Sequence, residues 1–123
     1  MDNKRILLVE DDPLLLKLYT DLLTGENFFV ESASDGLTAY QKMKQGGWDL
    51  VLLDILLPEL GGIEIVKKLK DDQEAKPNKK IVFLTNLDQG KEIDEIKKLG
   101  FEYIIKSSLN PDELVNKIKA YLA

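Results

Sequence analysis

Short apolar runs alternate with amphipathic segments along the whole sequence, and this alternation limits the possible folds more than any other feature. Five runs have the length and composition of β-strands, at residues 6–9, 28–33, 50–53, 81–84 and 101–105. Each run is followed by a segment whose apolar residues recur at helical spacing. Strict alternation of strands and helices implies a parallel sheet with right-handed crossovers, covered by helices on both faces. The sequence therefore predicts an α/β three-layer sandwich with five strands and five helices.

The polarity of the runs predicts the order of the strands. The second run contains Glu31, and the second and fifth runs are the more polar ones, as expected at the edges of a sheet. This favours the strand order 2-1-3-4-5 of flavodoxin-like folds. In that order the first and third strands are neighbours where the winding reverses, and ligands bind outside the carboxyl ends of the strands at this point.

Turn-forming residues mark the ends of the helices. Asp12 precedes Pro13 and is the expected N-cap of a first helix that runs to about Leu23 and is ended by Gly25. The apolar stripe of this helix is predicted to contain Leu15, Leu18 and Leu22, with Leu14 and Tyr19 beside them. Further helices are expected after Asp35-Gly36, at 63–69, at 93–99 and from Asn110.

Length and composition narrow the class of protein. A chain of 123 residues is expected to form a single domain over residues 1–123. It contains neither Cys nor His, which excludes disulfides, thiol catalysis, His-based acid–base catalysis and His-ligated zinc. The net charge of −5 argues against a direct nucleic-acid surface. We expect no signal peptide and no membrane-spanning segment, so a cytoplasmic location is the default.

Polar side chains follow four of the five predicted strands. Glu10 and Asp11 come after the first, Asp54 closes the third, Thr85 ends the fourth and Lys106 follows the fifth. Asp54 alone would be read as a turn cap, but in the predicted strand order these groups meet at one edge of the sheet. Three carboxylates in one place repel one another and need a cation. With oxygen ligands only, the ion expected is Mg²⁺.

At these residues the chain resembles the receiver domain of two-component response regulators, over its whole length. The resemblance rests on V-E-D-D-P at 9–13, L-D-I-L-L-P at 53–58 followed by Gly61-Gly62, F-L-T at 83–85 and Y-I-I-K at 103–106. It implies that Asp54 takes a phosphoryl group from a phosphohistidine of a partner kinase. It also implies Mg²⁺ bound by Asp11, Asp54 and the backbone carbonyl of Leu56, with Glu10 acting through water.

The same resemblance implies a conformational switch that follows phosphorylation. Lys106 would pair with one phosphoryl oxygen, and the Thr85 hydroxyl would donate to another. Tyr103 resembles the family's switch aromatic, whose ring turns inward as the Thr moves. This would change the surface formed by the fourth helix, fifth strand and fifth helix.

The implied partners are proteins. They are a sensor histidine kinase or phosphotransfer protein and a downstream target bound through that surface, with no direct contact to nucleic acid or membrane. The chain would be a stand-alone, chemotaxis-regulator-like domain or a piece of a longer protein, and a monomer or a phosphorylation-dependent homodimer. It would catalyse only its own phosphorylation and dephosphorylation and would not be an enzyme for other substrates.

The sequence departs from the family pattern at several positions. Asn86 stands where a small residue is usual, and Ser107 stands where Pro is usual, which puts a cis peptide bond there in doubt. The segment 85–106 is slightly short, so the fourth helix is expected to be abbreviated or displaced. Positions that tune dephosphorylation in the family carry Leu56 and Leu87, which cannot orient an attacking water, and this predicts a long-lived phosphoryl group.

Three other functions fit parts of the pattern. An Mg²⁺-dependent phosphohydrolase would use an aspartyl nucleophile, but it commonly has an acid–base Asp where this chain has Leu56. A flavodoxin-type carrier would not place acidic residues after the first strand, because they would repel a flavin phosphate. A receiver-like interaction module that is never phosphorylated remains the alternative.

Overall fold

Strands and helices alternate strictly in a computed structural model that describes residues 3–87 and 89–123. The strands are β1 (Arg5–Val9), β2 (Phe29–Ala33), β3 (Leu50–Asp54), β4 (Ile81–Thr85) and β5 (Glu102–Ile105). The helices are α1 (Pro13–Gly25), α2 (Gly36–Gln45), α3 (Gly62–Asp71), α4 (Lys91–Lys98) and α5 (Pro111–Leu122), with a 3₁₀ turn, η1, at Lys106–Ser108. The predicted alternation is confirmed.

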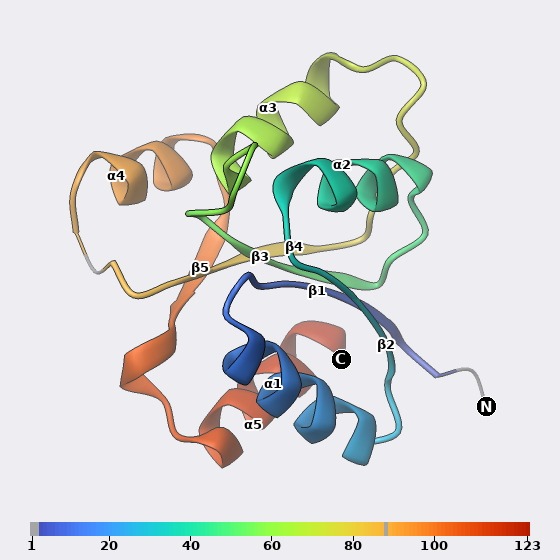
Figure 1. The fold of residues 1–123 in the computed structure, drawn as a ribbon, viewed down its shortest axis with the longest axis vertical. Coiled ribbons are helices and arrows are strands. Elements are labelled where there is room, and N and C mark those ends of the chain that lie inside the picture. Colours follow the sequence, from blue (N-terminus) through green and yellow to red (C-terminus); the bar gives the residue numbers. More distant parts are fainter. Residues whose placement is uncertain (1–2, 88) are drawn as a thin grey trace.

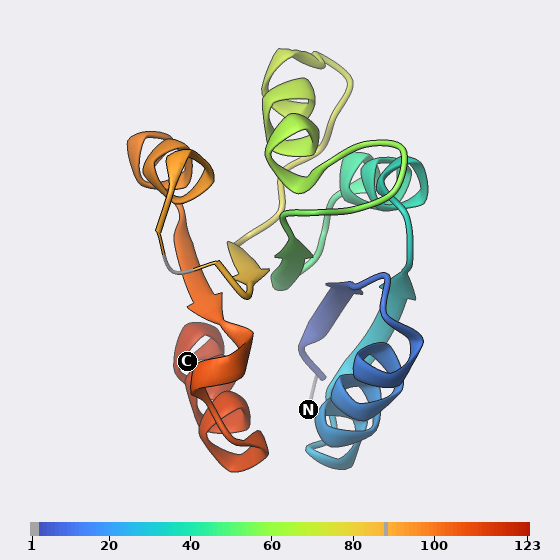
Figure 2. The ribbon, with the colours of Figure 1, turned by 60° about the vertical axis from the view of Figure 1, so that its left-hand side comes forward.

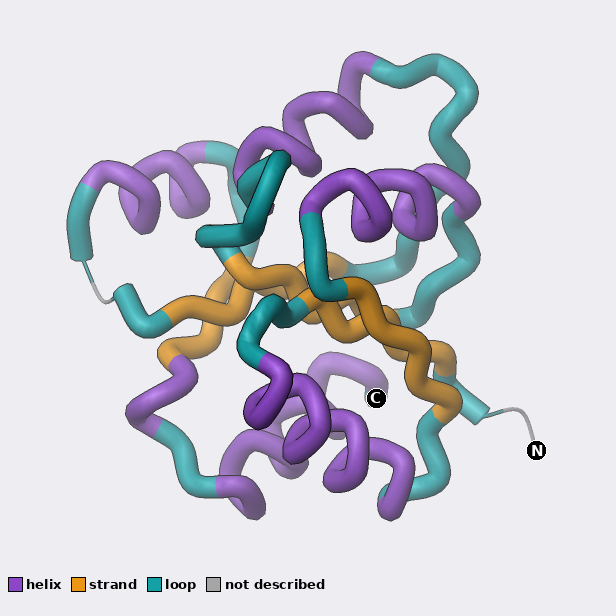
Figure 3. The backbone as a smooth tube through the Cα atoms, in the orientation of Figure 1, coloured by secondary structure: helices purple, strands orange, loops and turns teal. Residues whose placement is uncertain are grey.

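The five strands form one parallel sheet in the order β2-β1-β3-β4-β5, as predicted. Helices cover both of its faces: α2, α3 and α4 lie on one, and α1 and α5 lie on the other (Figures 1 and 3). The turned view in Figure 2 separates α4, α3 and α2 on their common face. Within the described ranges, no helix combines the length and apolar character that crossing a membrane requires.

Side chains of the central strands alternate between two apolar layers because successive residues of a strand point to opposite faces. Leu7 and Val9 of β1 pack under α2, α3 and α4, whereas Ile6 and Leu8 pack against α1 and α5. All four are fully buried. β2 and β5 contain exposed residues, as expected at sheet edges.

The predicted apolar stripe of α1 is confirmed at Leu15, Tyr19 and Leu22 and wrong at Leu14 and Leu18. Leu18 is 43% exposed and Leu14 is 81% exposed, whereas Tyr19 and Leu23 are buried against the sheet. Leu15, Leu16 and Leu22 complete the packed side. Leucines occupy so much of the circumference of this helix that their spacing alone does not show which of them are packed.

The fourth helix is short, as the sequence predicts. α4 spans 8 residues and is the shortest α-helix described. Leu99, expected to be its last apolar position, is instead its C-cap, and Gly100 follows with a φ of 85°. Glycine adopts this left-handed conformation without the cost that a side chain would add, so the helix ends here.

Candidate functional site

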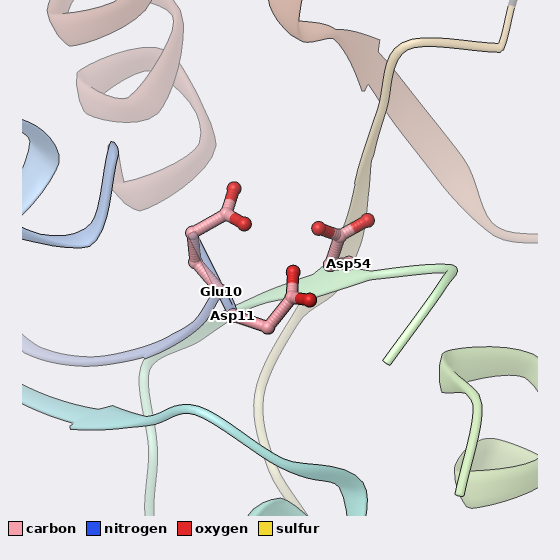
Figure 4. A group of neighbouring side chains, drawn as sticks. All are labelled: Glu10, Asp11 and Asp54. Atoms are coloured by element: carbon pink, nitrogen blue, oxygen red, sulfur yellow. The ribbon is translucent and has the colours of Figure 1, made fainter. Parts of the chain in front are cut away.

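The strand register brings two acidic residues to the same level at the carboxyl edge of the sheet. Val9 of β1 is paired with Leu53 of β3, so Glu10 and Asp54 are the next residues on neighbouring strands. Carboxylate oxygens of Glu10, Asp11 and Asp54 all lie within 4.8 Å of one another. Figure 4 shows the carboxylates of Asp11 and Asp54 directed toward a common space. The predicted carboxylate cluster is therefore present.

Lys106 reaches this cluster from the carboxyl end of the edge strand β5. It follows β5, and its Nζ donates to Glu10 Oε1 at 2.8 Å and to Asp54 Oδ2 at 2.9 Å. Burial of the ammonium acts to lower its pKa, but hydrogen bonds and charge attraction from the two carboxylates outweigh this and raise it. Lys106 is therefore held in its charged form. Peptide bonds across the described ranges are trans, including the bond to Ser107.

The burial of the three acids differs. Glu10 is 1% exposed and Asp54 is 6% exposed, whereas Asp11 is open to solvent. Three carboxylates face a single ammonium in this cluster. The oxygen-only donor set, the excess of negative charge and the open side at Asp11 fit Mg²⁺, which binds one or two carboxylates and keeps several waters. Asp11 and Leu56 both line the adjoining cavity of about 630 Å³.

Both oxygens of Glu10 are already engaged by the chain. Oε1 accepts from Lys106, and Oε2 accepts from the backbone N–H of Asp12 at 3.1 Å. The Asp12 side chain in turn accepts from the N–H groups of Leu14, at 2.9 Å, and Leu15, at 3.4 Å. Asp12 is thus the N-cap of α1, as predicted, and does not belong to the carboxylate cluster.

The loop after β3 packs directly against the backbone of Asp54. The N–H of Gly62 donates to the carbonyl of Ile55 at 2.8 Å. A Cβ atom at Gly62 would lie 2.2 Å from the Asp54 carbonyl oxygen, closer than any side chain can approach. Gly62 therefore allows the start of α3 to fix the position of Asp54, a contact that the sequence indicated only as a turn.

The two predicted switch residues occupy different environments. Thr85 is buried at the end of β4, one residue beyond the pair formed by Asp54 and Leu84, and its Oγ1 accepts from the N–H of Leu87 at 2.9 Å. Tyr103 on β5 is half-buried against the α2, α3 and α4 side, with the Nζ of Lys97 6.0 Å from its ring centroid. Asn86 is exposed.

Tyr19 is a neighbour of this site that sequence reasoning placed only in a helix stripe. Burial raises the pKa of its hydroxyl, and the charges of Lys106, Glu10 and Asp54 act on it. The signal available in the sequence is that Tyr19 is the one residue of the predicted apolar stripe that is not a leucine.

Comparison with known proteins identifies a family for this chain. The family model described as the response regulator receiver domain matches residues 6–119. The chain belongs to this family. Receiver domains are parts of two-component response regulators.

Relatives of this receiver domain include regulators of different length. The transcriptional regulatory protein CpxR homolog of Haemophilus influenzae is 38% identical over 120 residues, which cover 96% of this chain and 50% of that protein. The chain therefore spans about half the length of that relative. The polar-differentiation response regulator DivK of Brucella ovis is 33% identical over 120 residues, covering 98% of this chain and 97% of that protein.

A solved structure supports the fold. A CheY-like response regulator receiver domain protein from Methanospirillum hungatei superposes with a TM-score of 0.83 at 30% identity. The match covers 98% of this chain and 94% of that one. The receiver fold is thus shared almost end to end.

Proposed function

We propose that this receiver domain accepts a phosphoryl group on Asp54 from a phosphohistidine of a sensor histidine kinase or phosphotransfer protein. The observation that carries the proposal is the arrangement around Asp54. The carboxylate is almost completely buried, yet it is held by the Lys106 ammonium and stands beside two further acids. Burying this excess of negative charge is unfavourable for stability alone, so a role for the cluster in phosphoryl transfer accounts for it.

Phosphoryl transfer would proceed by in-line displacement. Oδ2 of Asp54 accepts the hydrogen bond from Lys106, so we assign Oδ1 as the attacking oxygen. A bond forms between Oδ1 and phosphorus while the phosphorus–nitrogen bond breaks, and the electron pair of that bond leaves with the imidazole. The Lys106 ammonium then pairs with a phosphoryl oxygen.

Asp11, Asp54 and the backbone carbonyl of Leu56 would hold Mg²⁺. Glu10 would act through water, because both of its oxygens are engaged by Lys106 and Asp12. When bound, the ion neutralises charge on the transferring phosphoryl oxygens.

Thr85 would convert phosphorylation into a change of surface. Its Oγ1 accepts from the Leu87 N–H, which leaves the hydroxyl hydrogen free to be donated to a phosphoryl oxygen. The phosphoryl group adds about −1.5 to −2 charges, enough to draw this loop inward. Tyr103 would follow, and the surface of α4, β5 and α5 would then bind a downstream protein.

The phosphorylating partner would dock around the acidic cluster. Leu14 lies in the first turn of α1, two residues after its N-cap. Leu56 lies two residues beyond Asp54 and is 64% exposed. Leu14 is 81% exposed, and Leu18, one turn further along α1, is 43% exposed. Protein partners commonly bury such exposed apolar residues.

Intact mass spectrometry tests the proposal. The purified chain is incubated with a small acyl-phosphate donor, with and without Mg²⁺. We expect one phosphoryl adduct on the wild type with Mg²⁺, none after chelation and none on Asp54→Asn. Asp21→Asn, which alters an exposed acid of α1, is the control and should react as the wild type does. A wild type that takes up no phosphoryl group would favour the unphosphorylated interaction module.

The phosphoryl group should also be long-lived. Neither Leu56 nor Leu87 carries a group that can orient an attacking water near Asp54. We expect slow hydrolysis of the isolated phosphoprotein and faster hydrolysis in Leu56→Asn. Rapid hydrolysis of the wild type, with no further increase in the variant, would contradict this.

A further inference from the structure

A second cavity lies far from the carboxylate cluster. Its volume is about 450 Å³, and its walls come from α3, from the connection between α3 and β4, and from the connection between α4 and β5. It includes Ile81, the first residue of β4, so it opens at the amino edge of the sheet, whereas Asp54 lies at the carboxyl edge. Helices α3 and α4 lie side by side in Figures 1 and 2. Phosphoryl transfer makes no use of this cavity.

The walls of the cavity are apolar and supported from behind. Leu69, Ile81, Leu99 and Phe101 line it. The Phe101 ring packs edge-on against Phe83, with centroids 5.5 Å apart, and Phe83 is completely buried. A wall that rests on the core keeps its shape, so the cavity is formed before any ligand arrives.

The charged residues of the cavity are all cationic. Lys67, Lys70 and Lys76 line it, and no carboxylate does. The Lys67 ammonium is paired with Glu95. Lys70 and Lys76 are exposed, and neither forms an ion pair with another residue of the described ranges. In a chain of net charge −5, an apolar cavity with only cationic groups at its rim selects anions over cations.

We propose that this cavity binds a small amphipathic anion, with an aromatic or short alkyl body and one carboxylate, sulfonate or phosphate group. The apolar body would contact Leu69, Leu99 and Phe101, and the anionic group would lie near Lys70 and Lys76. The volume is within the range of about 300 to 1,000 Å³ typical of small-molecule sites.

Naphthalene-1-sulfonate is the probe, titrated into the intact ¹⁵N-labelled chain and followed by NMR. Saturable shifts are expected for amides of residues 66–81 and 99–101. The neutral analogue 1-naphthalenemethanol should bind more weakly. Loss of both cations in the double variant Lys70→Gln, Lys76→Gln should weaken binding of the sulfonate about fivefold, as expected for two exposed charge contacts.

Two further variants separate charge from shape. Lys117→Gln removes one positive charge from α5, on the other face of the sheet, and should leave binding unchanged. Ala75→Trp fills the cavity while keeping its lysines, and it should abolish binding in a chain whose NMR spectrum remains dispersed. Shifts elsewhere in the molecule, equal affinity for the neutral analogue, or unchanged binding in the double lysine variant would each overturn the proposal.

Discussion

Lys106 and Lys44 each contact one Asp and one Glu. The two clusters that result differ in burial and in their further members. Lys106 lies 2.9 Å from Asp54 and 2.8 Å from Glu10, and all three side chains are at most 9% exposed. Lys44 of α2 lies 3.1 Å from Asp72 and 3.7 Å from Glu74, and its Glu is 86% exposed. The same pair of contacts thus occurs once in the interior and once at the surface.

The surface cluster gains a neutral hydroxyl donor, Tyr40, whereas the buried cluster gains a third acid. Asp72 accepts from the Tyr40 hydroxyl, the Glu74 backbone N–H and Lys44, and these hydrogen bonds lower its pKa to about 2. The Lys106 cluster instead gains a third acid, Asp11. An ion pair alone therefore does not identify a reactive site. We propose that burial together with an excess of negative charge does, and the variants below test that distinction.

Among these variants, replacement of the lysine should give the largest difference in phosphorylation rate between the two clusters. Lys106→Met removes the cation that would stabilise the transferring phosphoryl group, and we expect phosphorylation by an acyl-phosphate donor to slow by about 10²- to 10³-fold. Lys44→Met should react at the wild-type rate, although it loses the same number of carboxylate contacts. Initial rates of adduct formation measure the difference, and equal rates for the two variants would contradict the account.

Magnesium should stabilise only the buried cluster. At a tenfold excess over its dissociation constant, Mg²⁺ should raise the free energy of unfolding by about 1.4 kcal/mol, measured by urea denaturation. Asp11→Asn should lose this gain, whereas Glu74→Gln should keep it. A Mg²⁺ effect that survives Asp11→Asn would place the ion elsewhere.

Acid should act on the surface cluster through Asp72. Its folded-state pKa of about 2 lies below its ordinary value of 3.8, so its contribution to stability is complete above about pH 4 and is lost as pH falls through 2. The difference in urea midpoint between wild type and Asp72→Asn should therefore shrink between pH 5 and pH 2. A difference that stays constant over this range would show that the hydrogen bonds do not favour the ionised form.

Tyr40→Phe should have the smallest effect. It removes the first and largest cause of the lowered pKa of Asp72, so the pH-dependent part of the midpoint difference should decrease. Phosphorylation and the Mg²⁺ effect should not change, because the lost hydroxyl donates to Asp72, which is not part of the carboxylate cluster. A fall in phosphorylation rate would indicate that the two clusters communicate.

The buried cluster could be predicted from the sequence, and the surface cluster could not. Topology alone brings the residues after parallel strands to one edge, so Glu10, Asp54 and Lys106 could be placed together from their positions after β1, β3 and β5. The contact between Tyr40 and Asp72 joins α2 to the C-cap of α3 and depends on the rotation of each helix about its axis. Spacing does not fix such rotations, and the wrong placement of Leu14 and Leu18 on α1 has the same cause.

Close backbone contacts were also beyond the reach of the sequence. The pair Gly61-Gly62 predicts a turn, but only the three-dimensional packing reveals that a side chain at Gly62 would collide with the Asp54 carbonyl. The hydrogen bond from Leu87 to the Thr85 hydroxyl likewise depends on the local path of the loop.

The central claim, that Asp54 is the phosphoacceptor, is tested most directly by chemical trapping. The chain is phosphorylated with a small acyl-phosphate donor and Mg²⁺, treated with borohydride, and digested for peptide mass spectrometry. Borohydride reduces an aspartyl phosphate to homoserine, which marks the residue. The account predicts homoserine at position 54 and an unmodified Asp72. Homoserine at another acidic residue, with Asp54 intact, would contradict it.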